Sequence, residues 1–394
     1  MKKYWLFSFI WVLIFSSCTT VGPVENTAKP QISTEAKATS AHPLLSQART
    51  PAPTAPATPV PTPTIRPATY FHFEPGVNPL TGLPVADPSR LARRPVMVKI
   101  SNWPREGRPH AGLMSADLIF EYFIGHQMNR FPGIYYGDDS DVIGPVRSGR
   151  LVDAQLTNLY QGILGYGNAD PQVDEVLVEV LGDRAISFNE ASCPAMCGES
   201  THSATGVFAN SGALENFALN IGVDNSPPDL RGMYFQAEPP PGDASGLQLR
   251  LEYANFSIME WRYDPESGGY ALWMEEVSEG GLDLALMTDR NNDKAVHFEN
   301  VIVMYAEYIE YAPTLHDIVL QDVLDYRPPL LFRDGRLSYA TWRVPEPDRP
   351  IIFETSEGDP LPLKPGRTWV VIVGQQSRTV HPKGGEWEVY FELP

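Results

Sequence analysis

The stretch from Thr19 to about Ala68 constrains this chain most, because it cannot form part of a folded core. It is rich in Thr, Ala, Pro and Ser and contains no Phe, Trp or Tyr. Such a segment has too little apolar surface to offset the entropy lost on folding, and its prolines favour the extended polyproline II conformation. We therefore expect a semi-rigid linker over residues 18–69 and a globular part that begins near Tyr70.

The residues before this linker have the pattern of a secretory signal peptide, over positions 1–17. Lys2 and Lys3 form a basic start, an almost unbroken apolar run extends from Tyr4 to Phe15, and small residues precede Cys18. A cysteine at this place is typical of lipoprotein signals, and the apolar run is shorter than the roughly 20 residues that a permanent span needs. We therefore predict an extracytoplasmic protein anchored to the cell membrane by lipid on Cys18.

The charge and the motif content of the chain narrow the classes of partner. The sequence has 48 acidic and 30 basic residues and a formal net charge of −18. Binding to nucleic acid requires basic surface that neutralises phosphates, so we expect no nucleic-acid partner. The sequence contains no phosphate-binding Gly-Lys-Ser loop, no dinucleotide-binding fingerprint and no His-Glu-x-x-His motif. We therefore expect no cofactor.

The globular part divides into two regions with different hydrophobic patterns. In residues 70–231, strand-like apolar segments such as Pro95–Ile100 are mixed with segments of helical spacing, at about 149–161, 172–181 and 210–220. The first strand-like segments follow each other too closely for helical crossovers, so we predict an α/β domain with a mixed sheet. Residues 232–394 consist almost entirely of strand-like segments and turns, which predicts a mainly β domain.

The segment Val142–Arg150 is the best candidate for a functional site. Its pattern predicts the end of a strand, a tight Gly-Pro turn and a helix that begins near Leu151. A helix N-terminus presents unpaired N–H groups, Ser148 suits the N-cap position, and Arg147 and Arg150 add two cations. The pattern indicates an anion-binding turn. The alternative is that both arginines pair with acidic surface residues.

The turn and several other segments of the chain resemble a known family. The YerB-like family of bacterial lipoproteins has segments similar to Ile143–Arg150, Asn129–Phe131, Asp117–Glu121, Asn78–Pro84 and Arg94–Val98. The resemblance extends from about Asn78 to about Val373. It implies a two-domain, membrane-anchored, extracytoplasmic protein, and it implies no particular reaction.

Two loop features near position 200 complete the candidate residues. His202 corresponds to the histidine of a Pro-His-Asn-like motif in that family, although Thr201 and Ser203 flank it here. A lone loop histidine is more often a hydrogen-bonded surface residue than a proton carrier. Cys193 and Cys197 are the cysteines that remain beside Cys18, and outside the cytoplasm we predict that they form a disulfide. A zinc site with His202 is the alternative, but the local sequence lacks a fourth ligand, so we predict no metal.

Two classes of function fit these observations. The first is a binding or scaffolding lipoprotein of the cell envelope that holds an anionic ligand. The second is an envelope enzyme that acts on a phosphorylated or glycosidic wall polymer, with Glu121 or Asp153 as the base and His202 assisting. A shared site requires the candidate side chains to converge in one cleft, namely Glu121, Arg130, Arg147, Ser148, Arg150 and His202.

Overall fold

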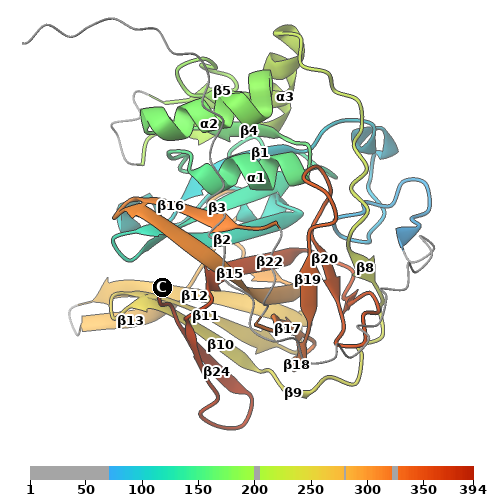
Figure 1. Ribbon diagram of the computed structural model, residues 1–394, viewed down its shortest axis with the longest axis vertical. Helices are drawn as coiled ribbons and strands as arrows, with labels where there is room; N and C mark the ends of the chain where they lie inside the picture. Colours follow the sequence, from blue (N-terminus) through green and yellow to red (C-terminus); the bar gives the residue numbers. More distant parts are fainter. Residues whose placement is uncertain (1–70, 199–204, 279–280, 322–326) are drawn as a thin grey trace, which may run out of the picture. The chain divides into compact units, whose positions relative to one another are not determined.

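The computed structural model describes residues 71–198, 205–278, 281–321 and 327–394. The predicted signal peptide, Cys18, the linker and His202 lie outside these residues. The described chain forms two main β-sheets, three α-helices and four short 3-10 helices, and the α-helices lie against the larger sheet (Figure 1). Within these residues, no helix is long and apolar enough to cross a membrane.

The three helices begin and end close to their predicted positions, at α1 (Leu151–Leu159), α2 (Pro171–Leu181) and α3 (Ser211–Asn220). Local capping explains two of the starts. The Asp170 side chain accepts a hydrogen bond from the Gln172 N–H at the start of α2, and the Asn210 side chain accepts one from the Ala213 N–H at the start of α3. Short polar side chains at these positions satisfy N–H groups that the helix itself leaves free.

The larger sheet contains strands from both halves of the sequence. Its strands are β1 (Val96–Ser101), β2 (Leu118–Gly125), β3 (Met128–Tyr135), β4 (Ile163–Tyr166), β5 (Ala185–Ser187), β9 (Ala244–Ser245), β15 (Asn300–Ala312), β16 (Leu315–Val319), β17 (Leu330–Arg333), β18 (Arg336–Tyr339) and β22 (Thr368–Gly374). Their order is β5-β4-β1-β3-β2-β22-β15-β17-β18-β9, and β16 pairs with the far end of β15. The first half joins the second where β2 pairs with β22.

Strand directions confirm the predicted mixed sheet. β1, β4 and β5 are parallel, β3 is antiparallel to both β1 and β2, and β22 is parallel to β2 and β15. The fold class is therefore confirmed: a mixed α/β sheet forms in the first half, and the second half is almost entirely β. The boundary predicted at 231/232 stays a prediction, and strands from both sides of it share the larger sheet.

The smaller sheet consists of β10 (Gln248–Ala254), β11 (Ser257–Asp264), β12 (Gly269–Ser278), β13 (Gly281–Leu286), β14 (His297–Phe298), β23 (Arg378–Val380) and β24 (Glu386–Tyr390). Its order is β13-β12-β11-β10-β24-β23, and β14 pairs with β12. Three two-stranded pairs complete the described strands: β6 (Met196–Cys197) with β7 (Phe208–Ala209), β8 (Tyr234–Phe235) with β21 (Pro362–Leu363), and β19 (Thr341–Arg343) with β20 (Ile352–Glu354).

The core has two layers, one on each face of the larger sheet. On one face, Val98 and Val371 pack with residues of the smaller sheet and of α3. On the other, Met97 and Val370 pack with α1 and α2. Because both faces are covered, β22 is buried along its whole length, and its sequence reads as a continuous apolar run.

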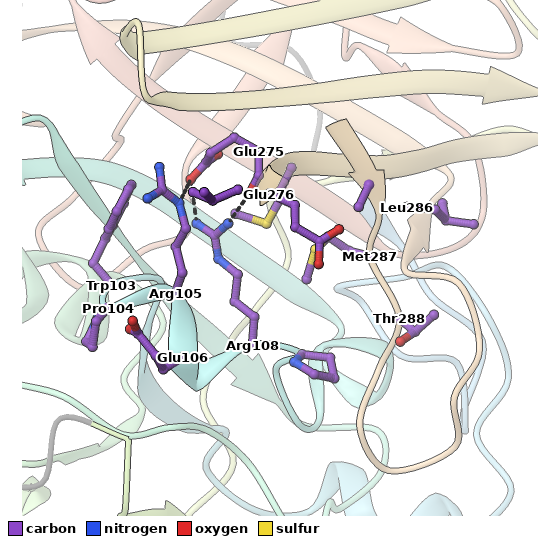
Figure 2. Close-up of a pocket in the computed structure, with 14 residues that line it drawn as sticks. Trp103, Pro104, Arg105, Glu106, Arg108, Glu275, Glu276, Leu286, Met287 and Thr288 are labelled. Atoms are coloured by element: carbon purple, nitrogen blue, oxygen red, sulfur yellow. Dashed lines mark hydrogen bonds and ion pairs between the residues drawn. The ribbon is translucent and has the colours of Figure 1, made fainter. Parts of the chain in front are cut away.

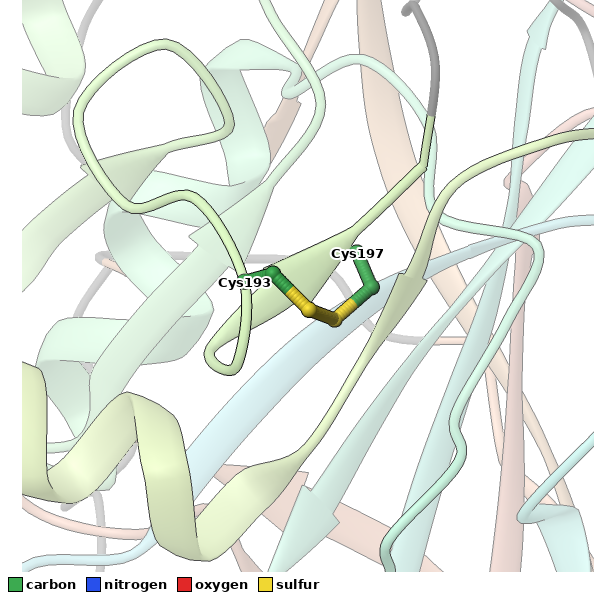
Figure 3. Close-up of a disulfide and its surroundings, with 2 residues drawn as sticks. All are labelled: Cys193 and Cys197. Atoms are coloured by element: carbon green, nitrogen blue, oxygen red, sulfur yellow. A yellow bond between two sulfur atoms is a disulfide. The ribbon is translucent and has the colours of Figure 1, made fainter.

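A disulfide joins Cys193, in the loop before β6, to Cys197 at the end of β6 (Figure 3). The zinc alternative for these cysteines required His202, which lies outside the described residues. Among the residues that are described, no group of three or more His, Cys, Asp or Glu side chains is placed to hold a metal ion.

Candidate functional site

The turn that contains Arg147 and Arg150, the arginine turn, lies at the carboxyl ends of β1 and β4. The Ser101 N–H donates a hydrogen bond to the Pro145 carbonyl, the Arg147 N–H donates to the Lys99 carbonyl, and the Gly167 N–H donates to the Arg147 carbonyl, at 2.7, 2.9 and 2.9 Å. These bonds hold the turn between the two strand ends. Ligands of α/β sheets bind in this position, beyond the carboxyl ends of parallel strands.

Helix α1 begins at Leu151 as predicted, but its N-cap is Arg150, two residues after Ser148. The Arg150 N–H donates to the Asp153 side chain at 2.7 Å, so the carboxylate of the first turn caps the helix. The Ser148 hydroxyl instead donates to the Asn168 side chain at 2.6 Å. Ser148 therefore belongs to the wall of the site, and its predicted capping role was wrong.

Asp153 is fully buried, and both of its oxygens have partners. One oxygen accepts from the Lys99 ammonium at 2.8 Å and also from the Tyr122 hydroxyl. The other accepts the Arg150 N–H. Burial lowers the pKa of Lys99 to about 7, although Asp153 opposes the shift. The carboxylate nearest to the turn is therefore already engaged by groups other than the arginine side chains.

A third arginine joins the turn through the register of the sheet. Arg130 on β3 lies opposite Ser101 of β1 and Tyr122 of β2, so its side chain leaves the sheet on the same face as Tyr122 and Lys99. Only 3% of its surface is exposed. Burial lowers the pKa of Arg130, and the nearby Arg150 and Arg147 lower it further. Three cations are therefore held close together.

The three guanidinium groups lack acceptors for part of their hydrogen-bonding capacity. The Nε atoms of Arg130, Arg147 and Arg150 are each buried without a hydrogen-bond partner among the described residues. Arg150 donates to the carbonyl of Gly149 at 2.8 Å, and Arg130 makes one long bond of 3.4 Å to the carbonyl of Asn129. None of the three forms an ion pair with a carboxylate in the described part of the chain, although the nearby Asp153 and Asp170 oppose the lowering of the pKa of Arg150 by burial.

A pocket of about 300 Å³ opens beside Arg150. The start of α2 and the turn between β15 and β16 form its other walls. The residues that line it are Ser148, Arg150, Asn168, Ala169, Asp170, Val173, Thr314 and Leu315. The next residue, His316, is buried, and neither of its ring nitrogens has a hydrogen-bond partner among the residues described. Burial lowers the pKa of His316, and Arg150 lowers it further, while Glu310 raises it. Both halves of the sequence therefore contribute to this pocket.

Glu121 does not belong with the arginines, which corrects the expected site. It is fully buried and lies on the face of β2 opposite to Tyr122, because neighbouring residues of a strand point to opposite faces. Its carboxylate accepts from Asn129, Tyr253 and Trp369, at 2.6, 2.9 and 2.8 Å. Burial raises its pKa to about 7, and these three hydrogen bonds oppose the rise. Glu121 therefore links the two sheets.

The structure thus brings together four of the six expected residues, namely Arg130, Arg147, Ser148 and Arg150. It places Glu121 elsewhere, and His202 lies outside the described residues. Lys99, Tyr122, Thr314 and His316 were not expected at the site. Only Lys99 had a local signal, since it is a lone charge within a predicted strand.

Comparison with known proteins identifies the family. Models of the family described as "Protein of unknown function (DUF3048)" match residues 80–220 with its N-terminal domain and residues 249–370 with its C-terminal domain. The chain belongs to this family. The DUF3048 match to residues 80–220 contains the three arginines, and the match to 249–370 contains the β15–β16 turn.

Relatives of this DUF3048 protein share its family and its fold. The chain is 26% identical over 308 residues to the "Putative lipoprotein YerB" of Bacillus subtilis (strain 168), which covers 75% of this chain and 85% of that protein. The crystal structure of the YerB protein from Bacillus subtilis matches with a TM-score of 0.62 at 24% identity, over 75% of this chain and 96% of that one. The family expected from the sequence motifs is thereby confirmed.

Proposed function

We propose that this chain is a membrane-anchored, extracytoplasmic lipoprotein that binds an anionic ligand of the cell envelope through Arg130, Arg147 and Arg150. One observation carries the proposal: three clustered arginines have buried Nε atoms without acceptors. The signal pattern ending at Cys18 and the name of the relative, a lipoprotein, support the location.

The energetics of the cluster favour an anionic guest. Buried cations are costly when no counter-charge and no acceptor compensates for the lost hydration. Asp153 cannot compensate all of them, since its oxygens bind Lys99, Tyr122 and the Arg150 backbone. A tetrahedral oxyanion such as phosphate or sulfate accepts several guanidinium hydrogen bonds at once. The N-terminus of α1 adds partial positive charge at the same place.

The enzyme alternative has less support from this geometry. It relied on Glu121 or Asp153 as the base. Glu121 faces the opposite side of the sheet and accepts three hydrogen bonds. Asp153 is fully buried and has no oxygen without a partner. We therefore propose binding as the function of this site.

Thermal unfolding with a panel of anions tests the proposal. Phosphate and sulfate should stabilise the wild type at matched ionic strength, by about 2.7 kcal/mol at roughly 100 times the dissociation constant. Arg147→Ala and Arg150→Ala should remove this gain. Arg343→Ala is the matched control, because Arg343 is an exposed arginine already paired with Glu354 at 3.1 Å. An equal gain in all variants, or no gain with any anion, would contradict the proposal.

Labelling with a palmitate analogue tests the location separately. The wild type should incorporate the label and need detergent for release from membranes, and Cys18→Ala should lose both properties. If Cys18→Ala is still labelled and still retained, the chain is not anchored through this cysteine.

A further inference from the structure

A second and larger pocket lies where the loop after β1 meets the β12–β13 hairpin (Figure 2). Its volume is about 640 Å³. Much of its lining is apolar, from Trp103, Pro104, Pro109, Met274, Val277, Ala285, Leu286 and Met287. It shares no lining residue with the pocket beside Arg150.

Among the described residues, the charged side chains of this pocket that have no ion-pair partner are carboxylates. Arg105 and Arg108 both bind Glu275, at 3.3 and 2.9 Å, so these cations are compensated (Figure 2). Glu106 and Glu276 also line the pocket and are exposed, and neither forms an ion pair with a described residue. A cationic group is therefore the natural complement of the rim.

The strand beside this pocket is an open sheet edge. Among the described strands, β13 is the outermost of the smaller sheet and pairs with β12 alone (Figure 1). Leu282 and Leu286 on β13 are 38% and 41% exposed, and Val277 on β12 is 67% exposed. Natural edge strands are usually protected by charged side chains, above all lysine, by proline or by a bulge. β13 contains neither lysine nor proline, it is in continuous register with β12, and its one charged residue is the acidic Asp283.

We propose that the β13 edge binds an extended segment of a partner protein by strand addition, and that this segment carries apolar side chains next to lysine or arginine. The partner backbone pairs with the free edge of β13. Apolar side chains of the added strand enter the pocket, and its long basic side chains reach Glu106 and Glu276 at the pocket rim. This binding site does not depend on the proposed anion site.

Defined peptides provide the test on the full chain without its lipid. The first is a peptide of about ten residues in which Lys and Val alternate. The second replaces every Lys with Glu, and the third keeps all the Lys but replaces the central Val with Pro. We expect binding of the first alone, because the second has the wrong charge and the third cannot complete a strand ladder. On binding, hydrogen exchange should slow in Gly281–Leu286.

Surface variants locate the site. Leu282→Lys with Leu286→Lys should weaken binding of the Lys-Val peptide by about tenfold or more, as lysine does on natural edges. Glu106→Gln with Glu276→Gln should weaken it less and reduce its salt dependence. Leu219→Lys is the matched control, since Leu219 is a 45% exposed leucine on helix α3 and not on a strand.

Three results would overturn the proposal. The proline peptide binding as tightly as its parent would show attraction to the acidic surface in general. Slowed exchange outside β13 would place the peptide elsewhere. A dimer that disappears in the Leu282→Lys, Leu286→Lys variant would assign the edge to a second copy of this chain.

Discussion

Two arginine clusters in this protein differ in one respect, which is the carboxylate that accompanies them. Arg105 and Arg108 share Glu275 with ion pairs of 3.3 and 2.9 Å. Arg130, Arg147 and Arg150 lie near Asp153 but form no ion pair with it. Each cluster contains one well-buried arginine, Arg108 and Arg130 respectively, and its other arginines are half-buried. The difference is therefore one of pairing and not of burial.

The hydrogen bonds of the two carboxylates explain the difference. One Glu275 oxygen accepts from both guanidinium groups, and the other accepts from the Ile258 N–H. The Asp153 oxygens accept hydrogen bonds from Lys99, Tyr122 and the Arg150 backbone N–H. A cluster whose carboxylate binds the arginine side chains is a structural cross-link. A cluster whose carboxylate is engaged elsewhere retains the capacity to bind an anion.

The largest expected effect is at the compensated cluster. Glu275→Leu should lower the free energy of unfolding by about 3 kcal/mol, because it leaves the well-buried Arg108 and the half-buried Arg105 without a counter-charge. Chemical denaturation measures this change. The variant Glu276→Leu is the control, since Glu276 is the exposed neighbour. A loss below about 1 kcal/mol would show that Glu275 does not hold the loop to the sheet.

The next effect concerns pH at Lys99, which pairs with Asp153 beside the three arginines. The folded pKa of Lys99 is about 7, below its ordinary value of 10.5. Between these values the unfolded state binds more protons, so stability should rise as pH rises from 7 to 10.5, by a few kcal/mol at most. Lys99→Met should flatten this rise. Denaturation midpoints at several pH values measure it, and an unchanged slope in Lys99→Met would assign the rise to other groups.

Whereas Glu275→Leu should lower the stability, the substitution of Arg130 should leave it unchanged or raise it. Arg130→Met removes an uncompensated buried cation and keeps most of the side-chain volume. Without anion, the variant should be as stable as the wild type or more stable, by up to about 2 kcal/mol. Phosphate, which should stabilise the wild type, should no longer stabilise the Arg130→Met variant. A large loss of stability in the absence of anion would show that Arg130 is compensated after all.

The smallest expected effect is Arg105→Lys. The ammonium keeps the charge beside Glu275, but it loses the planar stacking on Trp103, where the guanidinium carbon lies 4.2 Å from the ring centroid. We expect a loss of about 0.5 to 1 kcal/mol in denaturation. Arg262→Lys is a comparable control, since Arg262 stacks on Trp273 at 4.0 Å in another part of the sheet.

Much of the local structure was predictable from the sequence. The helices at 151–159, 171–181 and 211–220 follow from apolar spacing, and capping residues such as Asp170 and Asn210 set two of their starts. The mixed sheet follows from strand-like segments that succeed each other without room for crossovers. The turn with Arg147 and Arg150 was located in the same way. These features depend on residues close together in the chain, where backbone preference and periodicity act directly.

The composition of the site was decided by tertiary structure. Arg130 joins the turn because β3 places it opposite Ser101 and Tyr122. Thr314 and His316 arrive from a hairpin about 160 residues further along the chain. Glu121, like Arg130, lies in a segment that resembles the family, but its side chain points to the other face of the sheet because side chains alternate along a strand.

The sequence by itself determined a mixed α/β region with a cationic turn and a strand-rich region after it, and it predicts a lipoprotein-type signal and a proline-rich linker before them. Only the tertiary structure decided which cations remain without a partner. A carboxylate has few acceptor positions, and long-range contacts allocate them: Asp153 to Lys99 and Tyr122, and Glu275 to Arg105 and Arg108. Residue identity sets the charge, but the register of distant strands determines whether that charge is already compensated.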